Sequence, residues 1–147
     1  MYARILAAID GSPTSDRAFQ EAIAFTKNQK ANLRLVHIID KTPILRGYAD
    51  WLDDEEISGI FCQAGQRITE DALAQARKSD ITAESALLET TAKRLADVII
   101  DEANHWRADL VVMGTHGRHG IEHLLLGSVA EGVSRNTSIP LLLICGQ

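Results

Sequence analysis

Short apolar runs alternate along this chain with segments in which apolar residues recur every three or four positions. The runs predict five strands, at 5–9, 33–40, 82–89, 109–114 and 139–144. Ile5–Ile9 and Asp109–Gly114 are the most evenly apolar, as expected for strands buried on both faces of a parallel sheet. Thr82–Glu89 is more polar, and Pro140 lacks a backbone donor, so these two runs predict edge strands.

Segments with helical periodicity separate the predicted strands. After a helix that follows the first strand, further helices are expected at 61–78, 95–103 and 127–135. Ser12 is suited to cap the helix that follows the first strand, and Thr90 or Thr91 is suited to cap the helix that begins near Leu95. Residues 41–58 show no sustained period and predict a long loop, in which the acidic run 53–56 begins the next helix.

The order of elements, βαβαβαβαβ, predicts an α/β fold in which helices cover both faces of a parallel sheet, as three αβα layers. Placing the evenly apolar first and fourth strands in the middle gives the strand order 3-2-1-4-5. In such a sheet the chain leaves these two strands in opposite directions, and ligands bind in the crevice at their carboxyl ends. Asp10 and Gly114 are expected at that crevice.

Composition narrows the class of protein. A length of 147 residues, 46% of them hydrophobic, fits a single domain over residues 1–147. The net charge of −5 argues against nucleic acid and anionic membranes as partners. Cys62 and Cys145 suggest no disulfide framework, and no apolar run approaches the ~20 residues that span a bilayer, so we expect a cytoplasmic protein without membrane insertion.

Half of the ten glycines fall between Gly114 and Gly132, directly after a predicted strand. Glycine allows backbone N–H groups to approach a ligand, and a helix start adds positive charge, so this stretch favours an anion site for nucleotide phosphates. A glycine-rich turn that only packs is the alternative. Arg118 can add a contact to phosphate. Because the G-x-x-x-x-G-K-[ST] and G-x-G-x-x-G patterns are absent, binding is better supported than turnover.

Polar residues also stand at the ends of the first two predicted strands. Asp10 can bond a ribose hydroxyl or help to hold a divalent ion beside phosphates. Alternatively, its carboxylate bonds the amides of the following turn, as is common in D-G-S segments. The backbone near His37 and Asp40 can flank a base.

Three histidines in the glycine-rich stretch have the spacing H-x-x-H-x-x-x-H. His116, His119 and His123 would align on one face of a helix and offer a transition-metal site. Gly117 and Gly120 argue against a helix there, so the better prediction is that these histidines donate hydrogen bonds to phosphate. Ser128 lacks the G-x-S-x-G context of a nucleophile.

Together these segments resemble the universal stress proteins, small cytoplasmic α/β proteins of the adenine nucleotide α-hydrolase-like group. The resemblance covers nearly the whole chain, through I-L-A-A-I-D-G-S, A-D-L-V-V-M-G-T-H-G-R-H-G, L-L-L-G-S-V-A and I-P-L-L-L-I. The family's ATP-binding pattern, G-x-x-G, nine residues and G-[ST], is matched by Gly114, Gly117, Gly127 and Ser128. The family's usual G-x-P segment before the third helix is replaced here by Glu89-Thr90-Thr91-Ala92.

The resemblance implies a set of site residues and a mode of assembly. The residues that it assigns to ATP are Ala8, Asp10, Val36, His37, Met113, Gly114, His116, Gly117, Arg118, Gly127, Ser128 and Val129. Asp10 would contact ribose or a Mg or Mn ion, and the backbone near Val36 and His37 would meet adenine. It also implies a homodimer formed by antiparallel pairing of the last strand, Ile139–Ile144.

The resulting hypothesis is a dimeric, ATP-binding regulator of stress or energy response that acts on an unidentified protein partner, with any hydrolysis or autophosphorylation weak. Two alternatives stay open. One is a scaffold that works through its dimer edge without nucleotide. The other is an ATPase or nucleotidyl transferase, against which the S-G-G-x-D-S loop of related pyrophosphatases is missing after Asp10.

Overall fold

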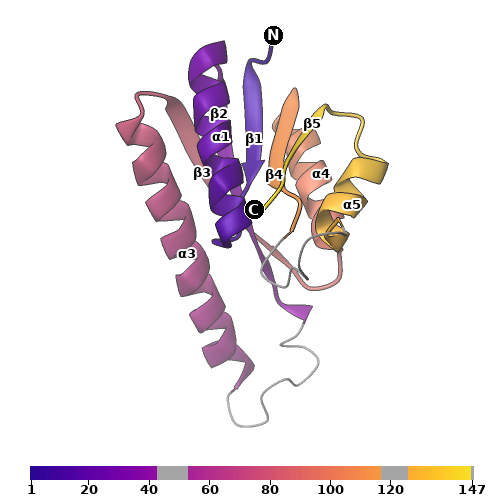
Figure 1. Cartoon of the computed structure of the whole chain (residues 1–147). Helices are drawn as coiled ribbons and strands as arrows, with labels where there is room; N and C mark the ends of the chain where they lie inside the picture. Colours follow the sequence, from indigo (N-terminus) through magenta and orange to yellow (C-terminus); the bar gives the residue numbers. More distant parts are fainter. Residues whose placement is uncertain (43–52, 117–125, 147) are drawn as a thin grey trace.

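The computed structural model describes residues 1–42, 53–116 and 126–146 (Figure 1). Strands and helices alternate along these residues. Their bounds are β1 Arg4–Ala8, α1 Pro13–Gln29, β2 Asn32–Asp40, α3 Asp54–Lys78, β3 Thr82–Thr90, α4 Leu95–His105, β4 Leu110–Gly114, α5 Ser128–Asn136 and β5 Leu141–Ile144. Among them no helix is long and apolar enough to cross a lipid bilayer.

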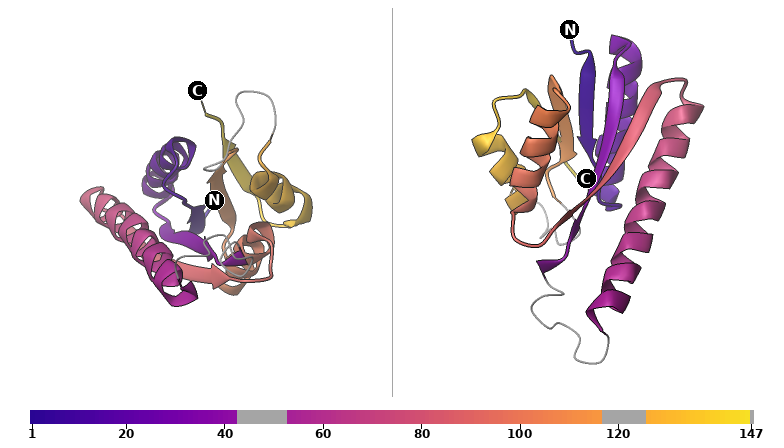
Figure 2. Two further views of the ribbon diagram at one scale, coloured as in Figure 1. Left: turned by 90° about the horizontal axis from the view of Figure 1, so that it is seen from below. Right: turned by 180° about the vertical axis from the view of Figure 1, so that it is seen from behind.

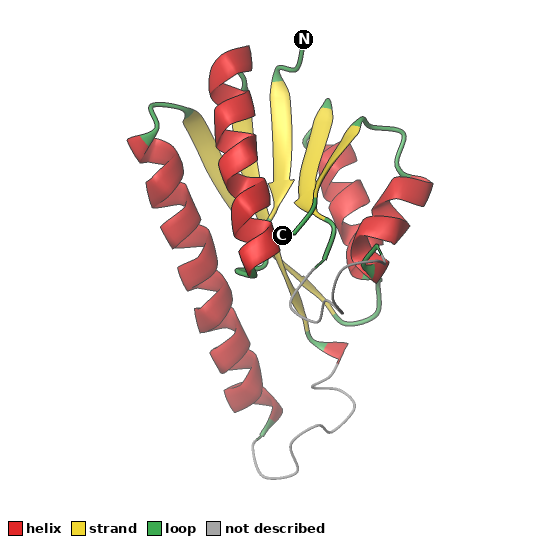
Figure 3. Cartoon of the chain, in the orientation of Figure 1, coloured by secondary structure: helices red, strands yellow, loops and turns green. Residues whose placement is uncertain are grey.

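The five strands form one parallel sheet in the order β3-β2-β1-β4-β5. Helices α1 and α3 lie on one face, and α4 and α5 lie on the other, which gives three layers (Figures 2 and 3). The predicted α/β class and strand order are therefore confirmed, with β3 and β5 at the two edges. The physical reason is burial: Ile5, Leu6 and Val112 in the central strands are 0% exposed.

Alternate residues of the strands supply two separate cores. On the face of α1 and α3, Leu33 and Leu35 pack with Phe19 of α1 and Ala76 of α3. On the opposite face, Val36 and Leu6 pack with side chains of α4 and α5, among them Ile99 and Val133. Ala18, Ala22, Ile23 and Thr26 recur at helical spacing along one face of α1, and all four are buried.

Helix α3 begins earlier than the predicted loop 41–58 allows. The Asp53 side chain accepts a hydrogen bond from the Glu56 amide, and the helix runs from Asp54. The predicted acidic helix start is confirmed, but the loop prediction is wrong for residues 54–58. These residues are mostly exposed, so they carry no apolar period that could have shown a helix.

Two other predicted boundaries are also wrong. Helix α4 has Arg94 as its N-cap, without a side-chain cap bond, while the Thr90 hydroxyl bonds Lys93 instead. Thr90 still belongs to β3, where it pairs with Asp40, so it stands too early to cap α4. Strand β5 begins at Leu141 and not at Ile139, although the Pro140 carbonyl already accepts a hydrogen bond from β4.

Candidate functional site

The carboxyl ends of β1 and β4 lie side by side in the middle of the sheet. The strands are paired from Ile5 and Leu110 to Ala7 and Val112. The chain then passes from β1 to α1 on one face, and α5, which follows β4, lies on the other face. This is the switch point at which open α/β sheets bind ligands. The turns after β1 and β4 are thus brought together as predicted.

The turn after β1 is built around Asp10. Its carboxylate Oδ1 accepts a hydrogen bond from the Ser12 amide at 2.8 Å, and its own amide donates to the Ser15 hydroxyl at 2.9 Å. Ser12 in turn caps α1 by accepting from the Ser15 amide. Gly11 adopts a φ of 76°, a left-handed conformation that favours glycine. One oxygen of Asp10 therefore holds this turn, which is the structural role considered from the sequence.

Thr115 ties the end of β4 to the start of α5 and to β5. Its amide donates to the Ile144 carbonyl at 2.9 Å, and its carbonyl accepts from the Gly127 amide at 2.7 Å. Its hydroxyl lies 2.9 Å from Nδ1 of the half-buried His116. The N-terminus of α5 is therefore fixed directly beside the carboxyl end of β4.

Close packing accounts for the absence of side chains at Gly114 and Gly127. A Cβ atom at Gly114 would lie 2.9 Å from Cγ2 of Thr14, in the first turn of α1. At Gly127 it would lie 2.8 Å from the Thr115 carbonyl oxygen. Both glycines are thus required by neighbouring protein atoms, whatever their backbone amides do for a ligand.

The first turn of α5 differs from that of α1 in how its amides are satisfied. Ser12 caps α1 with its side chain, whereas the N-cap of α5 is Gly127, which has no side chain to offer. Ser128 is exposed at the first position, and Val129 is half-buried behind it. The amide groups of this turn and the helix dipole together favour an anion at this place.

The hydrogen bonds at the end of β2 decide which backbone groups there are suited to contact a base. The buried His37 donates from Nδ1 to the Ile9 carbonyl at 2.8 Å, and the Val36 carbonyl accepts from the Ile9 amide. Successive residues of a strand turn their backbone groups to opposite sides. Because Lys41 bonds the Thr90 carbonyl of β3, the backbone of His37 also faces β3.

The remaining predicted site residues fall into two groups. Ala8 is half-buried at the end of β1, and Met113 is buried in β4 one residue before Gly114. Gly117, Arg118 and the histidines at 119 and 123 lie outside the described residues, so their roles stay predictions. Within the described ranges, no three His, Cys, Asp or Glu side chains are grouped as for a metal ion.

A charged cluster with a thiol lies at the carboxyl ends of β2 and β3, and the sequence did not reveal it. Glu89 Oε2 lies 2.7 Å from Lys41 Nζ, and its Oε1 accepts a hydrogen bond from the Cys62 thiol of α3 at 3.3 Å. The hydrogen bond to Glu89 raises the pKa of Cys62, and the Lys41 ammonium lowers the pKa of Glu89. The three residues are far apart in sequence, so no local pattern marks them.

Comparison with known proteins identifies the family. A sequence profile described as the universal stress protein family matches residues 1–144. The chain belongs to the universal stress protein family. One relative, universal stress protein MJ0531 of Methanocaldococcus jannaschii, is 32% identical over 146 residues, which cover 98% of this chain and 82% of the relative.

Solved structures of universal stress proteins share the fold. The structure of the protein MJ0577 has a TM-score of 0.85 at 22% identity and covers 100% of this chain and 98% of its own. A universal stress protein of Archaeoglobus fulgidus in complex with dAMP has a TM-score of 0.69 at 24% identity, with 97% and 98% covered. Other structural neighbours are complexes with cAMP and with AMP.

Proposed function

We propose that this universal stress protein binds an adenine nucleotide, with ATP as the preferred ligand, between the turns that follow β1 and β4. The observation that carries the proposal is the α5 N-terminus, which has no side-chain cap and is held by Thr115 beside the end of β4. Phosphates are bound in this way at helix starts. Complexes of structural neighbours with dAMP, cAMP and AMP support an adenine nucleotide.

The phosphates are assigned to the amides of Gly127, Ser128 and Val129, together with the Ser128 hydroxyl. Met113, Gly114 and His116 would line the ribose and phosphates from the end of β4. Gly117 and Arg118 are assigned from the sequence pattern alone. In this proposal the Asp10 carboxylate contacts ribose or an accompanying Mg or Mn ion, and Ala8 lines the same crevice.

For the base, the hydrogen bonds at the end of β2 suggest a different contact from the one that the family resemblance gave. The His37 backbone faces β3, and the Val36 carbonyl already bonds Ile9. Ile38 is the next residue whose backbone groups face the side on which β1 has ended at Ala8. We therefore assign the adenine contact to the Ile38 backbone, with Val36 and His37 shaping the wall behind it.

Two measurements test nucleotide binding directly. The purified protein is denatured and any released nucleotide is identified by chromatography, and equilibrium dialysis then measures binding of ATP with and without Mg²⁺. We expect saturable binding below physiological millimolar ATP. If dialysis shows no saturation in that range, the proposal is wrong.

The variant Asp10→Asn separates the structural role of Asp10 from its role toward a metal ion. Asparagine keeps the oxygen that accepts from the Ser12 amide but removes the negative charge. We expect the affinity for ATP with Mg²⁺ to fall about tenfold. AMP binding without metal stays unchanged if the carboxylate holds the ion, and falls as well if the carboxylate contacts ribose. Asp16→Asn, an exposed carboxylate in the first turn of α1, is the matched control. Equal affinities of the two variants for ATP with Mg²⁺ would exclude a metal role.

The wider role that we propose is that of a cytoplasmic homodimer whose binding of a protein partner responds to ATP, as a regulator of stress or energy response. The apolar β5 edge supports the dimer, since Leu141–Ile144 are all only half-buried.

A nucleotide-independent scaffold is the second candidate, because packing alone explains Gly114 and Gly127. Capture of partners with and without ATP distinguishes the two, since only the regulator predicts a difference. Weak ATP hydrolysis would appear as phosphate release that Asp10→Asn abolishes.

A further inference from the structure

The first turns of α3 project past the sheet and past α1 (Figures 1 and 2). A Cβ atom at Gly65 would lie against Leu87 of β3, and Cys62 contacts Glu89, one residue before the end of that strand. Earlier residues of α3 therefore lie beyond the end of β3. None of the residues from 54 to 64 is buried, whereas the sheet side of the later turns is.

An apolar stripe runs along these projecting turns. Ile57, Ile60, Phe61 and Ala64 recur at i, i+3, i+4 and i+7, which places them on one face of the helix. Ile60 is 58% exposed and Phe61 is 38% exposed. Within the described ranges, none of the four belongs to either core of the molecule. The stripe is therefore an apolar helix face that the described part of the chain leaves open.

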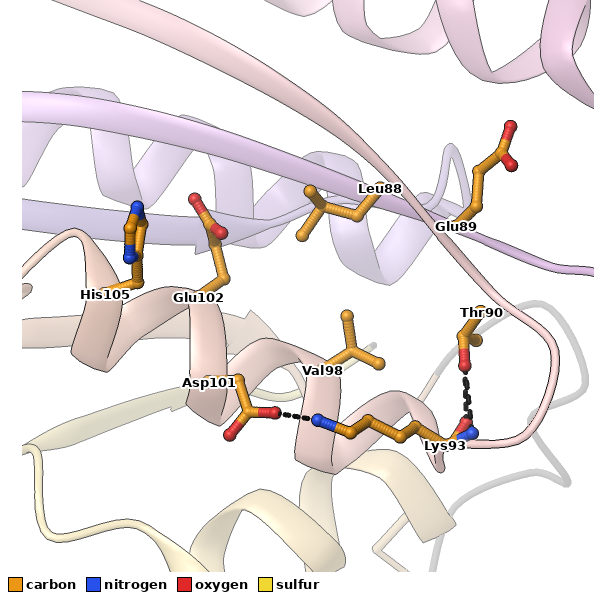
Figure 4. A pocket seen from close by; sticks show the side chains of 8 residues that line it. All are labelled: Leu88, Glu89, Thr90, Lys93, Val98, Asp101, Glu102 and His105. Carbon is orange, nitrogen blue, oxygen red and sulfur yellow. Dashed lines mark hydrogen bonds and ion pairs between the residues drawn. The ribbon is translucent and has the colours of Figure 1, made fainter.

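Unpaired charges lie at both ends of the stripe. The acidic run 53–56 precedes it and Arg67 follows it. In the part of the chain that the structure describes, none of these five residues forms an ion pair. The groove between β3 and α4 differs, because its three carboxylates are all paired, among them Asp101 with Lys93 (Figure 4). Charges that can attract a partner are thus left at α3 and not at the groove.

The spacing of these charges matches a second copy of the same helix. Glu56 and Arg67 are eleven positions apart, about three helical turns, so both flank the stripe on the same side as Ile60. If two copies of α3 cross antiparallel at Phe61, Glu56 of each lies beside Arg67 of the other, twice by symmetry. A parallel pair would instead set the two acidic runs against each other.

The same register avoids the other acidic side chains of the helix. Glu70 and Asp71 follow Arg67 by one turn, and in this crossing they fall beyond the start of the partner helix at Asp54. The helix dipole also favours the antiparallel arrangement, in which Arg67 meets carboxylates at an N-terminus.

We propose that two copies of the chain associate through antiparallel pairing of their α3 stripes, Ile57, Ile60, Phe61 and Ala64, with Arg67 of each copy paired to Glu56 of the other. Helix α3 packs on β2 and β3, and β5 forms the opposite edge of the sheet, so this contact is separate from a β5 dimer and joins such dimers. It does not depend on nucleotide. With four apolar side chains from each copy, the interface is smaller than the ~1,200 Å² of a stable complex, so it forms only at high concentration.

Sedimentation equilibrium of the full chain without nucleotide tests the contact. We expect the weight-average mass to rise between about 10 µM and about 1 mM, as for a weak association. The readout is the rise above the mass at the lowest concentration, so the result does not depend on whether a β5 dimer is present.

Two alanines of the same helix provide matched variants. Ala64→Glu places a carboxylate in the stripe, and Ala74→Glu makes the same change at an exposed position ten residues later. We expect Ala64→Glu to weaken the association at least about tenfold, and Ala74→Glu to leave it within about twofold. Both variants add one negative charge, so a difference between them cannot come from net charge.

A charge exchange tests the register. Arg67→Glu and Glu56→Lys should each weaken the association about fivefold, and the double variant should restore it to within about twofold of the native chain. The two positions are too far apart along one helix to pair within a copy, so restoration requires a contact between copies. Circular dichroism confirms that every variant is folded.

Several results would overturn the proposal. One is a mass that stays constant up to about 1 mM. A rise in mass that Ala64→Glu leaves unchanged would place the association on another surface. Failure of the double variant to restore binding would exclude the pairing of Arg67 with Glu56, and so would stronger association of Glu56→Lys, which long-range repulsion between chains of net charge −5 would predict.

Discussion

The Cys62 thiol is held by its hydrogen bond to the Glu89 carboxylate. A carboxylate that accepts from a thiol favours the protonated form, so this bond raises the pKa of Cys62, and partial burial acts in the same direction. The Lys41 ammonium opposes the shift only weakly. Because the thiolate is the reactive form of cysteine, Cys62 should be protected from electrophiles and oxidants near neutral pH.

This protection is testable against the second cysteine of the same chain. We expect iodoacetamide to alkylate Cys62 more slowly than the exposed Cys145 at pH 8, with mass spectrometry reporting each site. Glu89→Gln should speed the reaction at Cys62 severalfold and leave Cys145 unchanged, because the neutral amide no longer favours the protonated thiol. Equal rates at Cys62 in the native chain and the variant would show that Glu89 does not control the thiol.

Ser15 offers a second prediction for a single residue. Its hydroxyl accepts the Asp10 amide hydrogen at 2.9 Å, and its side chain is buried. Ser15→Ala leaves that amide without its acceptor, so the free energy of unfolding should fall by about 1–2 kcal/mol. Ser134→Ala, which removes an exposed hydroxyl from α5, should change it by less than about 0.5 kcal/mol. Urea denaturation measures both, and similar losses in the two variants would contradict this role of Ser15.

At the scale of elements, glycines in two helices predict opposite effects of the same substitution. A Cβ atom at Gly132 of α5 would lie 2.7 Å from Cβ of Ala96 in α4, while Gly59 of α3 has no atom within 4 Å of that position. Gly132→Ala should lower the free energy of unfolding by about 1–2 kcal/mol through overpacking, despite the better helix propensity of alanine. Gly59→Ala should raise it by about 0.5–1 kcal/mol. Thermal unfolding of both variants checks the sign, and stabilisation by Gly132→Ala would mean that α4 and α5 can separate.

The elements themselves could largely be predicted where their residues are buried. The continuous apolar runs of β1 and β4 and the helical stripe of α1 could be recognised because these side chains are buried in the two cores. Boundaries set by exposed or competing groups could not be predicted. The start of α3 depends on Asp53 and an exposed first turn, and Thr90 remains paired in β3 and so does not cap α4.

Only part of the candidate site could be inferred in the same way. That the turns after β1 and β4 lie at the same edge of the sheet follows from the rule for strand ends, which the strand order satisfies. That Gly114 packs on Thr14, and that the His37 backbone faces β3, depends on contacts between segments distant in sequence. Such contacts leave no periodic signal, so the proposal that the base contacts the Ile38 backbone could not be made before the register was known.

At the scale of the whole molecule, side-chain pairs between residues distant in sequence connect the sheet with a helix. The sequence predicted the layers but not these pairs. Arg34 of β2 donates from Nε to Glu102 of α4 at 2.7 Å, although 68 positions separate them, and also pairs with Glu84 of β3. Strand order was predictable because it follows from burial. The groove between β3 and α4 was not, because it depends on how far α4 lies from the sheet edge.

The two edges of the sheet allow a test of how copies of the chain assemble. The Ile144 carbonyl accepts from Thr115 on the β4 side, so the backbone groups of Leu141 and Leu143 point outward. If homodimers form by antiparallel pairing of β5, Leu143→Pro removes a donor from that pairing without breaking a bond to β4. We expect this variant to sediment as a monomer at micromolar concentration.

Ser85→Pro makes the same change at the outward side of β3 and should leave the dimer intact, while circular dichroism confirms that both variants are folded. A dimer that survives Leu143→Pro but dissociates with Ser85→Pro would place the interface at β3 and would exclude the proposed β5 dimer.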